Sequence, residues 1–156
     1  MFKKILPDDI FLSVMKNYAA PEEELWKGTV DPRRPGRHLS GNEVIDAAVD
    51  LMYKNRHNSG ENYAAWLGFP IRDLNGFFRI MTGMTFVEWN DQFLLLMAKE
   101  LLDKSNLSSS EIAKWMHFTT VNVFGRWFRH LSGRQPIEWR IEVRSGLKGR
   151  KYHSDD

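Results

Sequence analysis

The sequence predicts an all-α fold in which a long central helix joins two similar helical subdomains, with a short helical extension before them. Three observations lead to this prediction. Apolar residues recur at helical spacing along most of the chain, without the sustained alternation that marks strands. Helix-capping signals recur, and one stretch of sequence is repeated about 50 residues further on. With 156 residues, 42 % of them hydrophobic, the chain has enough apolar surface to bury a core.

Residues 1–40 are predicted to form a helical extension and a linker. Residues 8–19 have apolar side chains on one side at helical spacing, Pro21 follows, and residues 22–26 are expected to add a turn of helix. Residues 29–41 contain two prolines and two glycines, which predicts a loop. The full predicted division is 1–40 for this extension, 41–104 for the first subdomain with its linker helix, 105–145 for the second subdomain, and 146–156 for a flexible basic tail.

Three predicted helices begin with a serine or threonine that is followed three residues later by glutamate. In such a capping box the two side chains accept hydrogen bonds from free amides of the first turn. The pairs are Ser40 with Glu43, Thr85 with Glu88, and Ser108 with Glu111. Pro136 suits a first helical position, because the amide that proline lacks would be unpaired there anyway.

One long helix is predicted over residues 86–104, between the repeated stretches. Residues 93–97 are apolar nearly all round, so this helix must be buried on several faces. We expect it to be a strut of about 27 Å shared by the two subdomains. A strut of that length suits two helices that are held about 34 Å apart, which is one turn of B-DNA.

The repeat covers most of both subdomains. Residues 77–89 (FFRIMTGMTFVEW) are echoed 50 positions later by residues 127–139 (WFRHLSGRQPIEW). Upstream, residues 64–69 are echoed by residues 113–118 at an offset of 49, so that the second copy gains one residue in between. Matching aromatic, arginine, glycine and Glu-Trp positions in one order indicates an internal duplication.

Each copy is predicted to be a helix-turn-helix unit. In the second copy, Ser108 caps a helix over residues 111–116, residues 117–120 form the turn, and a second helix over about residues 120–131 ends at Gly133. The expected inward stripe of that helix consists of Val123, Phe124, Trp127, Phe128 and Leu131. Its expected outward residues are Asn122, Gly125, Arg126 and Arg129. In such units the second helix enters the major groove of DNA.

These residues resemble a known family over about residues 43–145. The string Ala98-Lys99-Glu100-Leu101-Leu102, Ser108-x-x-Glu111-Ile112-Ala113, Phe118, Phe124, Arg126, Phe128-Arg129, Gly133, Pro136 and Trp139-Arg140 is similar to the second half of an AraC/XylS-type DNA-binding domain. The first half matches in outline, through Ala64, Leu67-Gly68, Leu74, Phe78-Arg79, Thr82-Gly83-Met84 and Trp89. The resemblance implies seven helices, two helix-turn-helix units and a role in bacterial transcription control.

The same resemblance implies which residues contact bases. By position these are Arg72 and Asn75 in the first unit, and Asn122 and Arg126 in the second, flanked by Thr119, Thr120 and Val121. Arginine binds guanine O6 and N7, and asparagine pairs with adenine. For Arg126 the alternative is a surface ion pair, and for Asn122 a solvated helix position.

Other cations are expected to contact phosphates or to support the fold. Phosphate contacts are predicted for Arg79, Lys114, Arg129 and Arg134. Arg140 is expected either to contact DNA or to pair with a carboxylate in the last helix. Arg33, Arg34 and Arg37 are expected to lie either in a flexible linker or in an arm that enters a minor groove.

The chain departs from the pattern of the resembled family at three positions. Gly76 stands where an arginine is common, so the first unit is expected either to position the protein on DNA rather than to specify its sequence, or to have lost contact with DNA. His117 replaces the usual glycine of the second turn, which predicts a strained backbone. Leu94 stands where the family often has arginine. Residues 1–40 are too few for a ligand-binding domain, so control by a small molecule within this chain is not expected.

Composition bears on the class of function. The chain has no cysteine, no nucleophile motif, no phosphate-cradling loop and no metal-ligand spacing among its five histidines, so we expect no enzyme, metal or cofactor. No apolar run approaches the roughly 20 residues that span a membrane, and the first six residues are too few for a secretion signal, so a cytoplasmic protein is expected. The six tryptophans and ten phenylalanines are expected in the core rather than in base stacking.

Two functions remain open from the sequence. The first is sequence-specific binding of double-stranded DNA for transcription regulation, by a monomer or weak dimer on the nucleoid. The second is an AraC-like interaction module that has lost DNA binding and docks RNA polymerase or another regulator. A net charge of only +2, together with Gly76 and Leu94, favours the second reading, whereas the cluster of basic residues after Trp115 favours the first.

Overall fold

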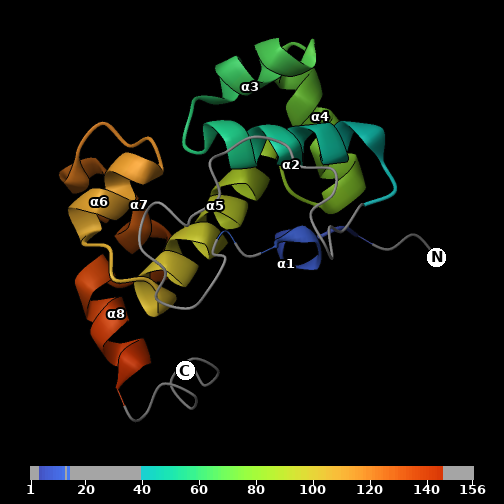
Figure 1. Cartoon of the computed structure of the whole chain (residues 1–156). Coiled ribbons are helices and arrows are strands. Elements are labelled where there is room, and N and C mark those ends of the chain that lie inside the picture. The colour runs from blue at the N-terminus through green and yellow to red at the C-terminus, as the bar shows by residue number, and fades with distance from the viewer. Residues whose placement is uncertain (1–3, 13, 15–39, 146–156) are drawn as a thin grey trace. The chain divides into compact units, whose positions relative to one another are not determined.

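The computed structural model describes residues 4–12, 14 and 40–145, and every regular element within them is a helix (Figure 1). The predicted all-α class is therefore confirmed. The expected turn of helix over residues 22–26, the cations Arg33, Arg34 and Arg37, and the basic tail over 146–156 lie outside the described residues. The described residues fall into two compact units, with residues 4–12 and 40–96 in the first and residues 14 and 97–145 in the second.

The first helix ends earlier than the predicted helix over residues 8–19, of which residues 13 and 15–19 lie outside the described part of the chain. Helix α1 spans Pro7–Ile10, and Phe11 after it has an extended backbone. The reason lies in the next residue, because the N–H of Leu12 donates to the Tyr53 hydroxyl at 2.6 Å and the Leu12 carbonyl accepts from the same hydroxyl at 2.9 Å. Backbone groups engaged in this way are not available to continue a helical ladder.

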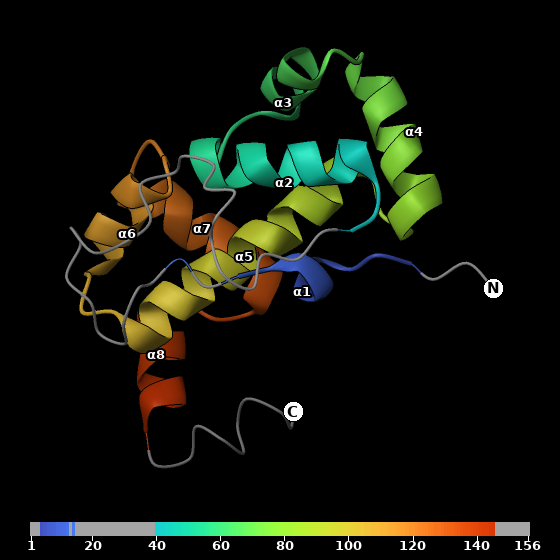
Figure 2. The ribbon, with the colours of Figure 1, turned by 45° about the vertical axis from the view of Figure 1, so that its right-hand side comes forward.

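The first unit contains α2 (Glu43–Asn55), α3 (Gly60–Leu67), α4 (Ile71–Thr82) and the first part of α5 (Phe86–Lys104), which are shown from a second side in Figure 2. The predicted capping box at Ser40 is wrong. The N-cap of α2 is Asn42, whose side chain accepts from the amides of Val44 and Ile45. Ser40 instead exchanges hydrogen bonds with the backbone of Asn42 and so shapes the approach to the helix.

Aromatic side chains form the core of the first unit. The ring of Phe78 on α4 meets that of Trp89 on α5 edge to face, with centroids 5.7 Å apart, and Trp89 stacks on Phe93 at 5.5 Å. The buried indole of Trp89 donates from Nε1 to the carbonyl of Ile5 at 2.9 Å, which satisfies its only polar atom. This packing fixes which face of α4 points outward.

The second unit contains the remainder of α5 with α6 (Ser109–Trp115), α7 (Val121–Ser132) and α8 (Pro136–Arg144). The capping boxes predicted at Thr85 and Ser108 are both present, and Pro136 is the first residue of α8 as expected. Of the predicted inward stripe on α7, Phe124 and Phe128 are fully buried, whereas Val123, Trp127 and Leu131 are half-buried.

The long helix α5 has the predicted bounds and the predicted burial. Phe93, Leu94, Leu95 and Met97 are buried, although they point to different sides of the helix. The division between the two units falls within α5, after Leu96. Each unit therefore includes a part of this helix in its own core.

Left-handed residues end the second helix of each copy and mark the turns before it. Gly133 ends α7 with φ of 82°, as predicted, and Gly83 ends α4 in the same way with φ of 86°. In the turn after α3, Gly68 has φ of 82°. The corresponding residue after α6 is His117, with φ of 70°, so the expected strain at that position is present.

Candidate nucleic-acid interface

Helix α7 carries an outward polar face in the second unit. Phe124 and Phe128 are buried in the core on one side of the helix, so that Asn122, Arg126 and Arg129 lie on the exposed side. The N-cap of the helix is Thr120, whose hydroxyl accepts from the amide of Val123 at 3.1 Å. The predicted contact residues Thr119 and Thr120 are exposed at this end, directly before the polar face.

Three cations of this unit that are predicted to contact phosphates lie at its surface. Lys114, on the preceding helix α6, and Arg129 are both exposed. Arg134, in the turn before α8, is exposed but forms an ion pair with Glu142 at 3.2 Å. An exposed pair of this kind contributes at most about 1 kcal/mol, so a phosphate could replace Glu142 as the partner of Arg134.

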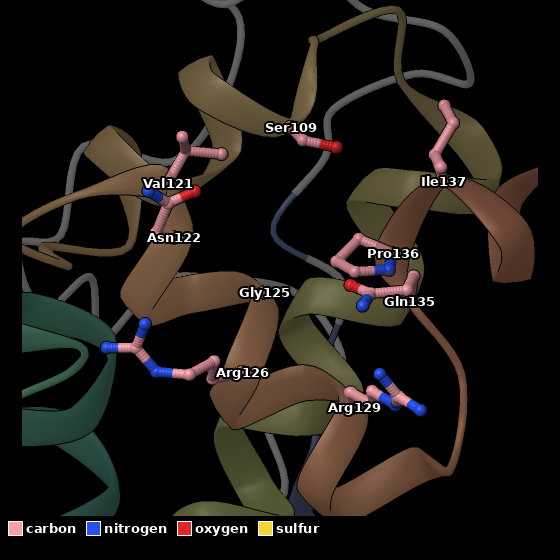
Figure 3. A pocket seen from close by; sticks show the side chains of 9 residues that line it. All are labelled: Ser109, Val121, Asn122, Gly125, Arg126, Arg129, Gln135, Pro136 and Ile137. Carbon is pink, nitrogen blue, oxygen red and sulfur yellow. The ribbon is translucent and has the colours of Figure 1, made fainter.

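A groove of about 370 Å3 lies beside the outward face of α7, where α7 meets the first residues of α6 and α8 (Figure 3). Gly125, without a side chain, leaves the middle of this groove open. In Figure 3 the side chains of Arg126 and Arg129, which share the outward face of α7, point away from each other. The groove is lined by Ser109, Val121, Asn122, Gly125, Arg126, Arg129, Gln135, Pro136 and Ile137.

Helix α4, the corresponding helix of the first unit, presents a weaker polar face. Arg72 and Arg79 are exposed, as the sequence predicts. Asn75 is half-buried, and its Oδ1 accepts from the amide of Val87 at 3.4 Å. Gly76 faces open space, and Ile80 is 75 % exposed. Of the two predicted base contacts in this unit, only Arg72 therefore projects freely from the helix.

Arg140 supports the fold, but its partners differ from the predicted carboxylate. Its Nε donates to the carbonyl of Leu102 at 2.8 Å, and its terminal nitrogen approaches the carbonyls of Leu101 and Ser105 at 3.3 and 3.4 Å. Burial lowers the pKa of Arg140, and the neighbouring charge of Arg144 lowers it further. Sequence reasoning missed Arg144, which donates to the carbonyls of Asp103 and Ser105.

The unsatisfied end of α5 is the signal that would have identified both arginines. The last carbonyls of a helix have no partner within it and need donors from elsewhere. A nineteen-residue helix that ends without a glycine, followed later by a helix with two arginines one turn apart, fits that need. Arg140 and Arg144 therefore belong to the support of the site rather than to its surface.

Within the described residues, no three His, Asp or Glu side chains are placed to hold a metal ion. None of the helices in the same part of the chain is both long and apolar enough to span a membrane.

Comparisons with known proteins agree with this architecture. The model of a family described as "Helix-turn-helix domain" matches residues 63–141, which is half of the chain. No curated protein matches the chain.

Solved structures with similar folds include the DNA-binding domain of AdpA, a global transcriptional factor, in complex with a target DNA. It is 24 % identical with a TM-score of 0.55, over 72 % of this chain and 96 % of that one. An AraC-type transcriptional regulator from Chromobacterium violaceum is 23 % identical with a TM-score of 0.54, over 66 % and 94 %. The C-terminal domain of AraT, a response regulator from Geobacillus stearothermophilus, is 22 % identical with a TM-score of 0.56, over 64 % and 84 %. The chain belongs to the AraC-type helix-turn-helix family.

Proposed function

We propose that the chain binds double-stranded DNA in a sequence-specific manner and thereby regulates transcription, with α7 as the main recognition helix in a major groove. The observation that carries this proposal is the division of α7 into a buried side with Phe124 and Phe128 and an exposed side with Asn122, Arg126 and Arg129. Side chains of these types read base edges and bind phosphates. The AdpA domain, which shares this fold, is in complex with a target DNA.

The roles of individual residues follow from their positions. Arg126 and Asn122 contact bases, with Thr119 and Thr120 beside them at the start of α7, while Lys114, Arg129 and Arg134 contact phosphates. In the first unit Arg72 reaches bases and Arg79 a phosphate, and α4 occupies the next major groove. Asn75 is a minor contributor, because its amide oxygen is already engaged by Val87. The protein acts by binding, without catalysis, as a monomer or weak dimer on the bacterial nucleoid in the cytoplasm.

A salt titration tests the binding of DNA. Fluorescence anisotropy with a labelled mixed-sequence duplex is expected to show affinity that falls steeply between about 50 and 200 mM salt, because each phosphate contact releases counterions. The double variant Arg126→Ala with Arg129→Ala is expected to flatten the slope. The matched control is Lys54→Ala, which removes an exposed cation of α2, outside both helix-turn-helix pairs. A flat salt profile, or no binding at about 50 mM salt, would contradict the proposal.

A second candidate function is an interaction module that docks RNA polymerase or another regulator. The surface of α4 favours it, since Gly76 gives no side chain and Ile80 is 75 % exposed where a DNA-binding face would be polar. Under this reading the duplex titration would be flat. An Ile80→Asp variant would then abolish the effect of the protein on transcription in a purified system without changing its melting temperature.

A further inference from the structure

The two copies of the helix-turn-helix unit differ at one place on the recognition helix. In the first copy Asn75 stands one turn after Ile71, and its oxygen accepts from the amide of Val87. In the second copy the corresponding residue is Gly125, which follows Val121 by one turn. In the first copy a side chain of the recognition helix therefore fills this place, whereas in the second copy the recognition helix has no side chain there.

The residues around this position are also packed more closely in the first copy than in the second. In the first copy, a Cβ on Gly60 would lie 3.0 Å from Ile71 and 3.2 Å from Val87, so the side chains of Ile71 and Val87 pack closely over that glycine. Their counterparts, Val121 and Ile137, line the groove of about 370 Å3 beside α7. In Figure 3 Val121 stands on one side of Gly125, and Pro136 and Ile137 stand on the other.

The walls of this groove combine an apolar middle with a polar rim. Val121, Pro136 and Ile137 supply the apolar surface, and two of them are open to solvent, with Val121 37 % and Ile137 52 % exposed. The rim carries Asn122 and Arg126, the proposed base readers, together with the polar side chains of Ser109, Arg129 and Gln135. An apolar hollow between base-reading side chains calls for an apolar group on the DNA. Among the base edges of the major groove, only thymine presents one, its 5-methyl group.

We propose that the hollow over Gly125 receives the 5-methyl group of a thymine, so that Val121 and Ile137 determine specificity at one base pair beside those read by Asn122 and Arg126. This inference rests on the proposed binding of DNA by α7. Burial of one methyl group is equivalent to about 0.8 kcal/mol, which is about fourfold in affinity. The first unit, where Asn75 and Ile71 occupy the corresponding place, does not discriminate in this way.

The test uses the full chain and a duplex obtained by random-site selection. Each thymine of the selected duplex is replaced in turn by deoxyuridine, which removes only the methyl group, and the Kd is measured for each duplex. One replacement is expected to weaken binding about fourfold. For the Ile137→Ala variant, the Kd of the duplex with uracil at that position, divided by the Kd of the duplex with thymine, is expected to fall toward one.

Two further variants separate this effect from folding. Ile141→Ala removes a more exposed isoleucine, 65 % open, from the next turn of the same helix and outside the groove, and it is expected to keep the fourfold ratio. Gly125→Ala adds a methyl group whose nearest neighbour is Gln135 Oε1 at 3.7 Å, an ordinary contact. Gly125→Ala is expected to raise the Tm, since alanine favours a helix more than glycine does. It is nevertheless expected to lower the ratio of the Kd for the uracil duplex to the Kd for the thymine duplex.

Three results would overturn the proposed thymine contact and leave the proposed binding of DNA intact. These are a selected sequence without thymine, uracil replacements that are all neutral, or an Ile137→Ala variant that weakens the thymine and uracil duplexes equally. In each case duplex binding with a preferred sequence would still support the proposed function. Failure of the selection to enrich any sequence, together with a flat salt profile, would overturn both.

Discussion

The guanidinium of Arg140 on α8 donates a hydrogen bond from Nε to the carbonyl oxygen of Leu102 near the end of α5, at 2.8 Å. Its terminal nitrogen lies 3.3 Å from the carbonyl of Leu101 and 3.4 Å from that of Ser105. One side chain thus donates to three carbonyls at the end of α5, where the helical ladder runs out of donors after the amide of Ser105 bonds to Leu101. The contact joins α8, which packs beside the proposed recognition helix, to α5.

We expect Arg140→Ala to lower the free energy of unfolding by about 2 kcal/mol, because hydrogen bonds from a charged donor are lost and the carbonyl of Leu102 loses the donor that Arg140 supplies. Arg140→Lys is expected to recover only part of this loss, since an ammonium group cannot reproduce the planar fork. Urea melts monitored by tryptophan fluorescence measure both variants.

The control for this experiment is Arg129→Ala, which removes an exposed arginine from α7 and is expected to change stability by less than about 0.5 kcal/mol. Equal stability of the Arg140→Ala protein and the unmodified protein would show that the contacts to α5 contribute nothing.

His117 and Gly68 occupy corresponding turns, and both are left-handed, with φ of 70° and 82°. A residue with a Cβ costs about 1 to 2 kcal/mol in this region, whereas glycine does not. His117→Gly is therefore expected to stabilise the protein by about 0.5 to 1 kcal/mol, after allowance for the greater freedom of glycine in the unfolded chain. The measurement is the midpoint of a thermal or urea transition.

The reverse substitution at the equivalent turn is the matched test. Gly68→His is expected to destabilise by about 1 kcal/mol through its backbone alone, since a Cβ at Gly68 would meet no atom within 4 Å. If both substitutions moved stability in the same direction, backbone strain would not be the cause.

The sequence predicted most of this fold because helical spacing, capping boxes and an internal repeat all depend on local chemistry. The bounds of α5 and the left-handed Gly83 and Gly133 follow from signals within a few residues of each. The failures at α1 and Arg140 have a different origin. The helix over 8–19 stops early because Leu12 bonds to Tyr53, 41 positions away, and Arg140 bonds to carbonyls more than 30 positions away. Such long-range partners are not visible in a pattern of neighbours.

The candidate site shows the same limit. Exposure of Arg126 and Arg129 follows from the buried stripe on α7, so their placement was predictable. The engagement of Asn75 by the amide of Val87 and the groove over Gly125 depend on how α4 and α7 pack against the helices that follow them. Arg56, at the end of α2, is buried with φ of 55°, and its carbonyl accepts from the Tyr63 hydroxyl. No local pattern of residues predicts this arrangement.

His57 predicts a dependence of stability on pH. Burial lowers the pKa of His57 below its ordinary value of 6.5, and the negative charge of Asp91 opposes this shift in part. The unfolded chain therefore binds a proton at His57 before the folded chain does as the pH falls. The free energy of unfolding is expected to decrease as the pH is lowered from about 6.5 through the folded pKa.

Urea melts at pH 7.5, 6.5 and 5.5 measure this slope, and a His57→Gln variant, which has no proton to gain there, is the control. The variant is expected to lose less stability than the unmodified protein over the same interval. If the two slopes coincide, the titration of His57 does not contribute.

Arg126 and Arg129 lie less than one turn apart on the outward face of α7, but their guanidinium groups point away from each other (Figure 3). We expect the loss of each side chain to affect DNA binding in a different way. A base reader contributes about 1 to 3 kcal/mol of discrimination at one base pair, whereas a phosphate contact acts alike on every sequence. With a selected duplex and its single-base variants, Arg126→Ala is expected to bring the Kd values at one position to within about twofold of one another. Arg129→Ala is expected to raise all Kd values by a similar factor and to reduce the slope of log K against log salt by about one. A uniform loss in both variants would mean that Arg126 contacts the backbone, and base reading by α7 would then rest on Asn122 and the groove over Gly125.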